Sequence, residues 1–306
     1  MNDLTTNFCG VILTNPFVLP SGIITEIPEH KRAIEAGVGA VTLKSLTYHK
    51  REGNPIPRVW RYDCGMINSV GLRNAGIEKG SEEIAKFIEE NKKIPVIVSL
   101  FATKIEEFIY LIDKIVPLEP AIIELNLSCP NVDDEFGKPL GMERGAAGQI
   151  VKEVKKRSFK IPVLAKLSPN VTNISEIAKS CEHAGADGIA AINTVGPGMI
   201  IDINKKKPVL GAIKGGVSGQ GILPIAVRCV YEIYEAVKIP IIGMGGVSKW
   251  QDAVEMIMAG GTLIGVGTAT YSKGMRIYEE LKKDLIIYMQ KQNIKNLKDI
   301  VGIAHH

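Results

Sequence analysis

The stretch that decides the fold is Glu124-Leu125-Asn126-Leu127-Ser128-Cys129-Pro130-Asn131. It ends an apolar run that begins at Ala121, and it adds two amides, a hydroxyl and a thiol to that run. A strand buried on both faces is a nearly continuous apolar run, and proline ends it because proline has no N–H for the ladder. The stretch therefore predicts a buried strand whose carboxyl end opens into an active site.

The same change from helix to buried strand recurs along the chain. Lys-Ile-Pro triplets at 93–95, 160–162 and 238–240 each close a charged helical segment and open an apolar run. Glycine turns that begin at Ala36, Ala184 and Ala259 also end helices and lead into strands. With two further apolar runs, the predicted core strands are 17–19, 40–43, 96–101, 121–125, 163–167, 188–192, 241–244 and 262–266.

Segments of helical period follow these strands. The clearest are 82–91, 105–115, 149–157, 174–183, 223–237, 250–258 and 276–290. Repeated strand–helix units without a linker predict one α/β domain over residues 1–306, folded as a (β/α)8 barrel, or TIM barrel. The alternative is a doubly wound open sheet, but no G-x-G-x-x-G motif opens the first helix.

The connections differ in length at the two ends of the predicted barrel. Helix-to-strand links are two or three residues, whereas strand-to-helix links are long at 47–76, 131–145 and 194–221. In a barrel the long links lie together on the C-terminal face, where they are candidate lids. Residues 4–15 alternate apolar and polar positions around a Cys-Gly pair, which predicts a hairpin that plugs the other end.

Composition excludes several function classes. The net charge is +4 with basic and acidic residues interleaved, which suits an anionic small molecule and not nucleic acid. The 5 cysteines contain no C-x-x-C pair, and no histidines have metal-ligand spacing, so neither an iron–sulfur cluster nor a metal site is predicted. No stretch approaches the ~18 apolar residues of a membrane span, and we expect a soluble cytoplasmic protein.

Glycines and polar residues gather at the predicted strand ends. Gly243–Val247 and Gly265–Ala269 end the last two strands, where barrels commonly bind phosphate. Lys44 and Lys166 stand at the mouths of two buried strands, and a buried unpaired charge is costly, so both favour an anionic ligand. The glycines could instead serve tight turns only, and Cys129 could be a small buried hydrophobe.

Taken in order, the motifs of this chain resemble those of the class 1 dihydroorotate dehydrogenases, and the closest appearance is that of the class 1B catalytic subunit. The resemblance covers nearly the whole chain. It rests on Asn15-Pro16 through Ser21-Gly22, Lys44-Ser45, residues 53–58, Asn68-Ser69-Val70-Gly71-Leu72, Asn126 to Asn131, Lys166, Asn193-Thr194, residues 215–219, Gly245-Gly246 and Gly267-Thr268.

The resemblance implies FMN at the barrel mouth, with the substrate lying on the flavin ring. The implied FMN contacts are Ser21, Gly22, Lys44, Ser45, Ser99, Asn126, Lys166, Ile192, Gly219, Gly245, Gly246, Gly267 and Thr268. The implied contacts to dihydroorotate or orotate are Lys44, Asn68, Ser69, Val70, Gly71, Leu72, Asn126, Asn193 and Thr194. Cys129 matches the catalytic base of the family, and Lys166 could stabilise negative charge on the reduced flavin.

The implied reaction belongs to pyrimidine (UMP) biosynthesis. Oxidising dihydroorotate removes a proton from C5 and a hydride from C6, so a base and a flavin are needed on opposite sides. In class 1B enzymes a separate iron–sulfur and FAD subunit passes electrons to NAD, and a homodimer of the catalytic chain is expected. Two alternatives stay open: another pyrimidine-base oxidoreductase of the same fold, and a non-catalytic subunit that binds flavin or phosphate.

Overall fold

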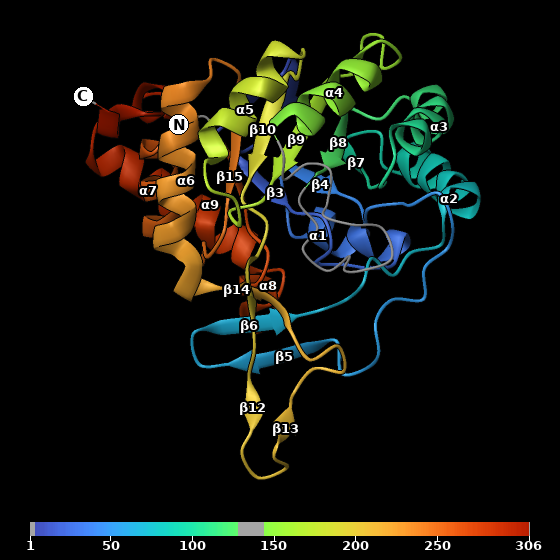
Figure 1. Ribbon diagram of the computed structural model, residues 1–306. Helices are drawn as coiled ribbons and strands as arrows, with labels where there is room; N and C mark the ends of the chain where they lie inside the picture. The colour runs from blue at the N-terminus through green and yellow to red at the C-terminus, as the bar shows by residue number, and fades with distance from the viewer. Residues whose placement is uncertain (1–3, 128–143, 306) are drawn as a thin grey trace.

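The computed structural model describes residues 4–127 and 144–305 (Figure 1). Parallel strands close into a barrel in the order β10-β15-β16-β3-β4-β7-β8-β9. These strands are β3 (Phe17–Leu19), β4 (Ala40–Thr42), β7 (Val96–Leu100), β8 (Ile122–Asn126), β9 (Val163–Leu167), β10 (Gly188–Ala191), β15 (Ile241–Met244) and β16 (Gly261–Gly265). The predicted (β/α)8 barrel is confirmed.

Helices surround the barrel (Figure 1). They are α1 (Lys31–Glu35), α2 (Ile77–Glu90), α3 (Ile105–Ile115), α4 (Arg144–Lys155), α5 (Ile174–His183), α6 (Leu223–Ala236), α7 (Trp250–Met258), α8 (Ala269–Lys273) and α9 (Ile277–Lys291). Short 3-10 turns add Ile27–His30, Val116–Leu118, Gln220–Ile222, Leu297–Ile300 and Ile303–His305. In the described part of the chain, no helix is both long and apolar enough to cross a membrane.

Helix α2 begins at Ile77, directly after the predicted connection 47–76 and five residues before the segment 82–91 in which the helical period was clearest. The first turn contains Gly80, a residue of low helix propensity. In the structure a Cβ at Gly80 would lie 2.6 Å from the Leu46 side chain. The glycine therefore allows α2 to pack closely against Leu46, in the segment that follows β4.

The hairpin of β1 (Thr6–Phe8) and β2 (Val11–Leu13) closes the amino end of the barrel. Its Phe8 and Leu13 are 0% and 1% exposed and pack with the apolar side chains inside the barrel. The Cys9 Sγ donates a hydrogen bond to the carbonyl of Asp187, directly before β10, at 3.1 Å. The predicted plug is thus present, and it completes the apolar core.

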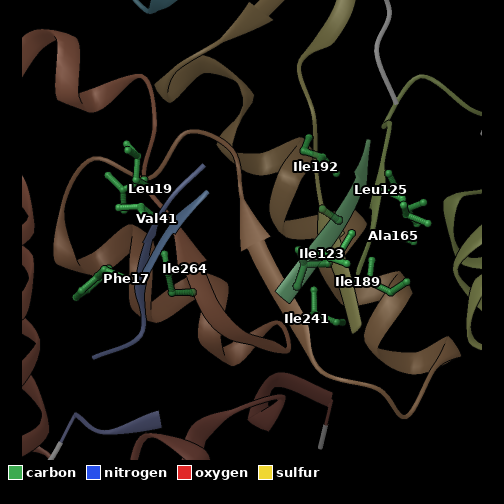
Figure 2. Close-up of a cluster of buried hydrophobic side chains, with 14 of the residues drawn as sticks. Phe17, Leu19, Val41, Ile123, Leu125, Ala165, Ile189, Ile192, Ile241 and Ile264 are labelled. Carbon is green, nitrogen blue, oxygen red and sulfur yellow. The ribbon is translucent and has the colours of Figure 1, made fainter. Parts of the chain in front are cut away.

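Side-chain alternation along the strands divides the barrel residues into two sets. On β8, Ile122 belongs to the cluster inside the barrel, while Ile123 and Leu125 pack outward against the helices (Figure 2). Because successive side chains point to opposite faces, Glu124 and Asn126 also point into the barrel. The same alternation applies to β7 and β9. The interior therefore changes from apolar to polar toward the carboxyl ends of the strands.

Two of the predicted long connections pair with each other into a small antiparallel sheet. Its order is β11-β14-β6-β5, with bounds β5 (Val59–Tyr62), β6 (Gly65–Asn68), β11 (Val195–Gly198) and β14 (Gly215–Ser218). A two-stranded ribbon of β12 (Ile201–Asp202) and β13 (Lys207–Pro208) projects beyond it (Figure 1). The third long connection, 131–145, lies mostly outside the described residues.

Candidate active site

Two adjoining cavities lie at the carboxyl ends of the barrel strands. The larger, here the glycine cavity, has a volume of about 260 Å³ and is bounded by the ends of β15 and β16. The smaller, here the lysine cavity, has a volume of about 140 Å³ and lies against the ends of β4, β8 and β9. Ser21, Lys166, Asn193, Thr194 and Thr268 line both, so the two cavities form one continuous site.

The glycine cavity needs the absence of side chains. Gly245 has φ +131° and Gly246 has φ +84°, and L side chains rarely adopt these conformations. A Cβ at Gly246 would lie 2.8 Å from the backbone nitrogen of Leu223. Two further residues of the lining bond to each other: the Thr268 hydroxyl donates to Ser218 Oγ at 2.9 Å. Backbone conformation and packing therefore require glycine here, and both glycines line the cavity without a side chain, as in phosphate-binding loops.

The lysine cavity holds two nearly buried ammonium groups. Lys44 is 7% exposed and Lys166 is 4% exposed. Lys166 Nζ lies 3.9 Å from Glu124 Oε1, so these two residues form an ion pair inside the barrel. Among the described residues, two ammonium groups line the cavity and one buried carboxylate lies beneath it, a positive balance that favours an anionic ligand.

A chain of hydrogen bonds runs beneath the lysine cavity. The Ser21 and Ser45 hydroxyl oxygens lie 3.1 Å apart, and those of Ser45 and Ser99 lie 2.9 Å apart. The Ser99 hydroxyl donates to Glu124 Oε1 at 2.8 Å, and the Asn126 side-chain NH₂ donates to Ser45 Oγ at 3.2 Å. These residues lie on β7 and β8 or shortly after β3 and β4, four neighbouring strands that the closed barrel brings together.

The structure brings most of the predicted site residues together. Those that line the glycine cavity are Ser21, Lys166, Ile192, Asn193, Thr194, Gly219, Gly245, Gly246, Gly267 and Thr268. Those that line the lysine cavity are Ser21, Gly22, Lys44, Ser45, Asn68, Val70, Gly71, Leu72, Asn126, Lys166, Asn193, Thr194 and Thr268. Their individual roles remain predictions.

Two predicted residues line neither cavity, and a third lies outside the described part of the chain. Ser99 lines neither cavity, because it lies behind Ser45 and is 0% exposed. Ser69 is also absent from both linings, and its hydroxyl accepts a hydrogen bond from the Asn54 side chain at 2.7 Å. Cys129 lies outside the described residues, so its predicted role as base stays a prediction.

Sequence reasoning gave no role to several residues that shape the site. Glu124 was quoted only as part of the decisive stretch, although its position two residues before Asn126 places both inside the barrel. Asn170 donates to the Thr194 carbonyl at 3.1 Å and accepts from the Gly196 N–H at 2.8 Å, so it holds the start of β11. Residues 61–65, at the β5–β6 turn, line the glycine cavity with no local signal in the sequence.

Two thiols away from the cavities, Cys9 and Cys181, are placed for packing. Burial raises the pKa of the Cys9 and Cys181 thiols to about 12, so both stay neutral at physiological pH. Within residues 4–127 and 144–305, no cluster of three or more His, Cys, Asp or Glu side chains could hold a metal ion. The chemistry that these residues offer is therefore concentrated at the barrel mouth.

Comparison with known proteins agrees with this geometry. The family model described as "Dihydroorotate dehydrogenase" matches residues 3–289. A protein of Thermoplasma volcanium is 42% identical over 305 residues, which cover 99% of each chain. A protein of Pyrococcus horikoshii is 40% identical over 302 residues, which cover 98% of this chain and 97% of the relative.

A third relative, from Brachyspira hyodysenteriae, is 40% identical over 307 residues, which cover 100% of each chain. All three relatives carry the name "Dihydroorotate dehydrogenase B (NAD(+)), catalytic subunit". The match extends over the barrel, the small sheet and both cavities, so it includes every element that forms the site. The chain therefore belongs to the dihydroorotate dehydrogenase family.

Proposed function

We propose that this chain oxidises dihydroorotate to orotate in pyrimidine biosynthesis. The observation that carries the proposal is the convergence of Lys44, Lys166 and three amide side chains on one cavity, beside a glycine-lined cavity at the ends of β15 and β16. Dihydroorotate offers a carboxylate and a ring of alternating N–H and C=O groups. Ammonium groups and amides match both features.

FMN is the cofactor that fits the two joined cavities. The backbone of Gly245, Gly246 and Gly267 lines the glycine cavity and suits a phosphate. The positive balance among the described residues of the lysine cavity suits a ring that gains negative charge. When bound, FMN supplies the acceptor for the hydride that leaves C6 of the substrate. The residues proposed to hold it are those that the two cavities share, together with the glycines of β15 and β16.

The protein's own task is to hold the substrate and to remove one proton. We assign Lys44 to the substrate carboxylate, because its ammonium group is nearly buried and lines the lysine cavity. Asn68 donates a hydrogen bond to the Gly216 carbonyl at 3.3 Å, which fixes this amide at the cavity wall. Cys129 is proposed to take the C5 proton as its thiolate, so that C5 loses a proton while C6 loses a hydride.

The electrons taken from the substrate must then pass to an acceptor outside this chain. The relatives are named as catalytic subunits of an NAD(+) form, and we propose that this chain likewise works with a separate electron-transfer subunit. The sequence has no clustered cysteines for an iron–sulfur cluster and no G-x-G-x-x-G motif for NAD, so both functions fit a second subunit.

The test is anaerobic reduction of the flavin. Protein loaded with FMN should be bleached by dihydroorotate and not by dihydrouracil, which lacks the carboxylate. Lys44→Met should weaken dihydroorotate binding about tenfold or more, because a charge-assisted contact is lost. The exposed Lys291→Met should behave as the wild type. Protein that binds FMN but is not bleached by dihydroorotate would contradict the proposal, and bleaching by dihydrouracil would favour the alternative pyrimidine oxidoreductase.

A further inference from the structure

A carboxylate without an assigned role lies beneath the lysine cavity. Glu124 is 1% exposed, and strand alternation directs it into the barrel one layer below Asn126. Its register partners are Ser99 on β7 and Leu164 on β9. A buried carboxylate costs stability unless it is paired and hydrogen-bonded, and a barrel interior is more simply filled with apolar side chains. The position therefore points to a use.

The ionised Glu124 fixes the direction of the hydrogen-bond chain above it. A carboxylate only accepts, so the single Ser99 proton is committed to Glu124 at 2.8 Å. Ser99 must then accept from Ser45, whose own proton is committed in turn. Ser45 consequently accepts from Ser21 and from the Asn126 NH₂ group. In this series of hydrogen bonds, every donor therefore points toward Glu124. The fixed direction of donation holds the NH₂ side of the Asn126 amide toward Ser45.

Glu124 also offsets the charge of Lys166. The two side chains are 1% and 5% exposed, so solvent screens their interaction little. Their 3.9 Å separation is longer than a hydrogen bond, so the ammonium hydrogens remain available to a group in the cavity. Lys166 lines both cavities, and its net effect on a bound ring depends on the carboxylate behind it.

We propose that Glu124 is a positioning residue of the flavin site: it lowers the positive potential that Lys166 presents to the ring, and through Ser99 and Ser45 it sets the orientation of Ser21 and Asn126. The inference rests on the proposed function in so far as FMN occupies the joined cavities. Glu124 touches neither cavity and acts only through these neighbours.

The charge is tested with Glu124→Gln in the FMN-loaded protein. Glutamine can still accept from Ser99 but carries no charge, so Lys166 is left unbalanced. Reduced flavin is then favoured about tenfold relative to the wild type, a rise of about 30 mV in the midpoint potential for a two-electron couple. Glu124→Asp keeps the charge but moves it away by the length of one methylene. The midpoint potential should therefore also rise, but by less than in Glu124→Gln. Unchanged potentials in both variants would overturn the charge role.

The direction of the hydrogen bonds is tested with Ser99→Ala. This variant keeps the Glu124–Lys166 pair, but the Ser45 hydroxyl loses the acceptor that fixes its proton. The midpoint potential should stay near that of the wild type, while orotate binds about threefold to tenfold more weakly, the cost of one misdirected hydrogen bond. Unchanged orotate affinity in Ser99→Ala would show that Glu124 does not orient Ser21 and Asn126 through Ser99 and Ser45. The Ser99→Ala experiment tests this orienting role even if the Glu124 variants do not fold.

The potentials are measured by anaerobic titration with dithionite and redox dyes, so they require FMN but no substrate turnover. If the wild type binds FMN and dihydroorotate fails to reduce it, the proposed function is wrong, and the potentials still decide on Glu124. If dihydroorotate bleaches the wild type and the Glu124 variants keep its potential, the proposed function stands and the charge role is wrong.

Discussion

The two ends of the barrel are built from the same strands and have opposite character. At the amino end, Ile97, Ile122 and Leu164 fill the interior beneath the hairpin plug. Two residues further along the same strands, Ser99, Glu124 and Lys166 form a polar layer. One step of the strand alternation therefore separates a layer that stabilises the fold from a layer that serves the cavities. The comparison predicts that substitutions at the two ends have separable effects.

The largest expected effect is on chemistry at the carboxyl end. Cys129→Ser should lower turnover near neutral pH by about 10²- to 10⁴-fold, because a serine hydroxyl is a far weaker base than a thiolate. FMN content and thermal stability should stay at their wild-type values. The measurement is the rate of anaerobic flavin reduction by dihydroorotate. A variant that keeps its rate would remove Cys129 from the mechanism.

The next effect is on stability at the amino end. Phe8→Ala removes a fully buried ring from the plug and should cost about 3–5 kcal/mol of unfolding free energy. Flavin reduction per bound FMN should not change. Ile12→Ala on the same hairpin is the control, since Ile12 is 59% exposed and its loss should cost less than about 0.5 kcal/mol. Denaturant unfolding measures both, and a slowed reaction in folded Phe8→Ala would break the separation of the two ends.

A smaller effect is expected where the backbone itself forms the cavity. Gly246→Ala forces a side chain onto φ +84° and against the Leu223 backbone, so it should cost about 1–3 kcal/mol and weaken FMN binding. Gly274→Ala is the matched control, because its φ is +71° and nothing lies within 4 Å of its Cβ position. Equal FMN affinity in the two variants would show that strain alone, and not the cavity wall, accounts for the effect.

The smallest expected effect is on the pH dependence of the unfolding free energy, which is measured separately from that of the reaction. His30 is 0% exposed, its ring packs edge-on against Phe87, and burial lowers its pKa. An unfolded histidine takes up a proton near pH ~6.5, whereas the folded one does so only at lower pH. The contribution of neutral His30 to the unfolding free energy is therefore complete above pH ~6.5, and it is lost as the pH falls toward the folded-state pKa.

The measurement is the unfolding free energy between pH 8 and pH 5. The decrease toward acid pH should be steeper for the wild type than for His30→Gln, and the exposed His183→Gln should follow the wild type. Parallel pH profiles for the wild type and His30→Gln would mean that His30 is not the group responsible.

Much of the barrel was predictable because its signals are local. The Lys-Ile-Pro triplets fix where strands begin, and the predicted bounds of α3, α5 and α7 agree with the structure. The small sheet was not predictable, because β6 pairs with β14 and no local pattern joins Asn68 to Gly216. Segments that the sequence presented as separate candidate lids are therefore one paired structure.

The site was predictable in its lysines and glycines and less so in its serines. Lys44 and Lys166 stand at strand ends that any barrel would bring together. Ser99 was expected to contact the flavin because only its place on the third predicted strand was visible. Its hydroxyl is instead used by Glu124 and Ser45 on neighbouring strands, a fact that depends on distances across the closed barrel.

The pairing of β6 with β14 also matters for anyone who wants to redesign substrate preference. Asn68 stands opposite Gly216, and a Cβ at Gly216 would lie close to the Thr194 side chain. The segments 59–72 and 194–218 are therefore a single exchangeable module, although a large part of the sequence separates them. A graft that replaces one segment without the other would leave unmatched strand edges, whereas a graft of both would carry the whole pocket wall with it.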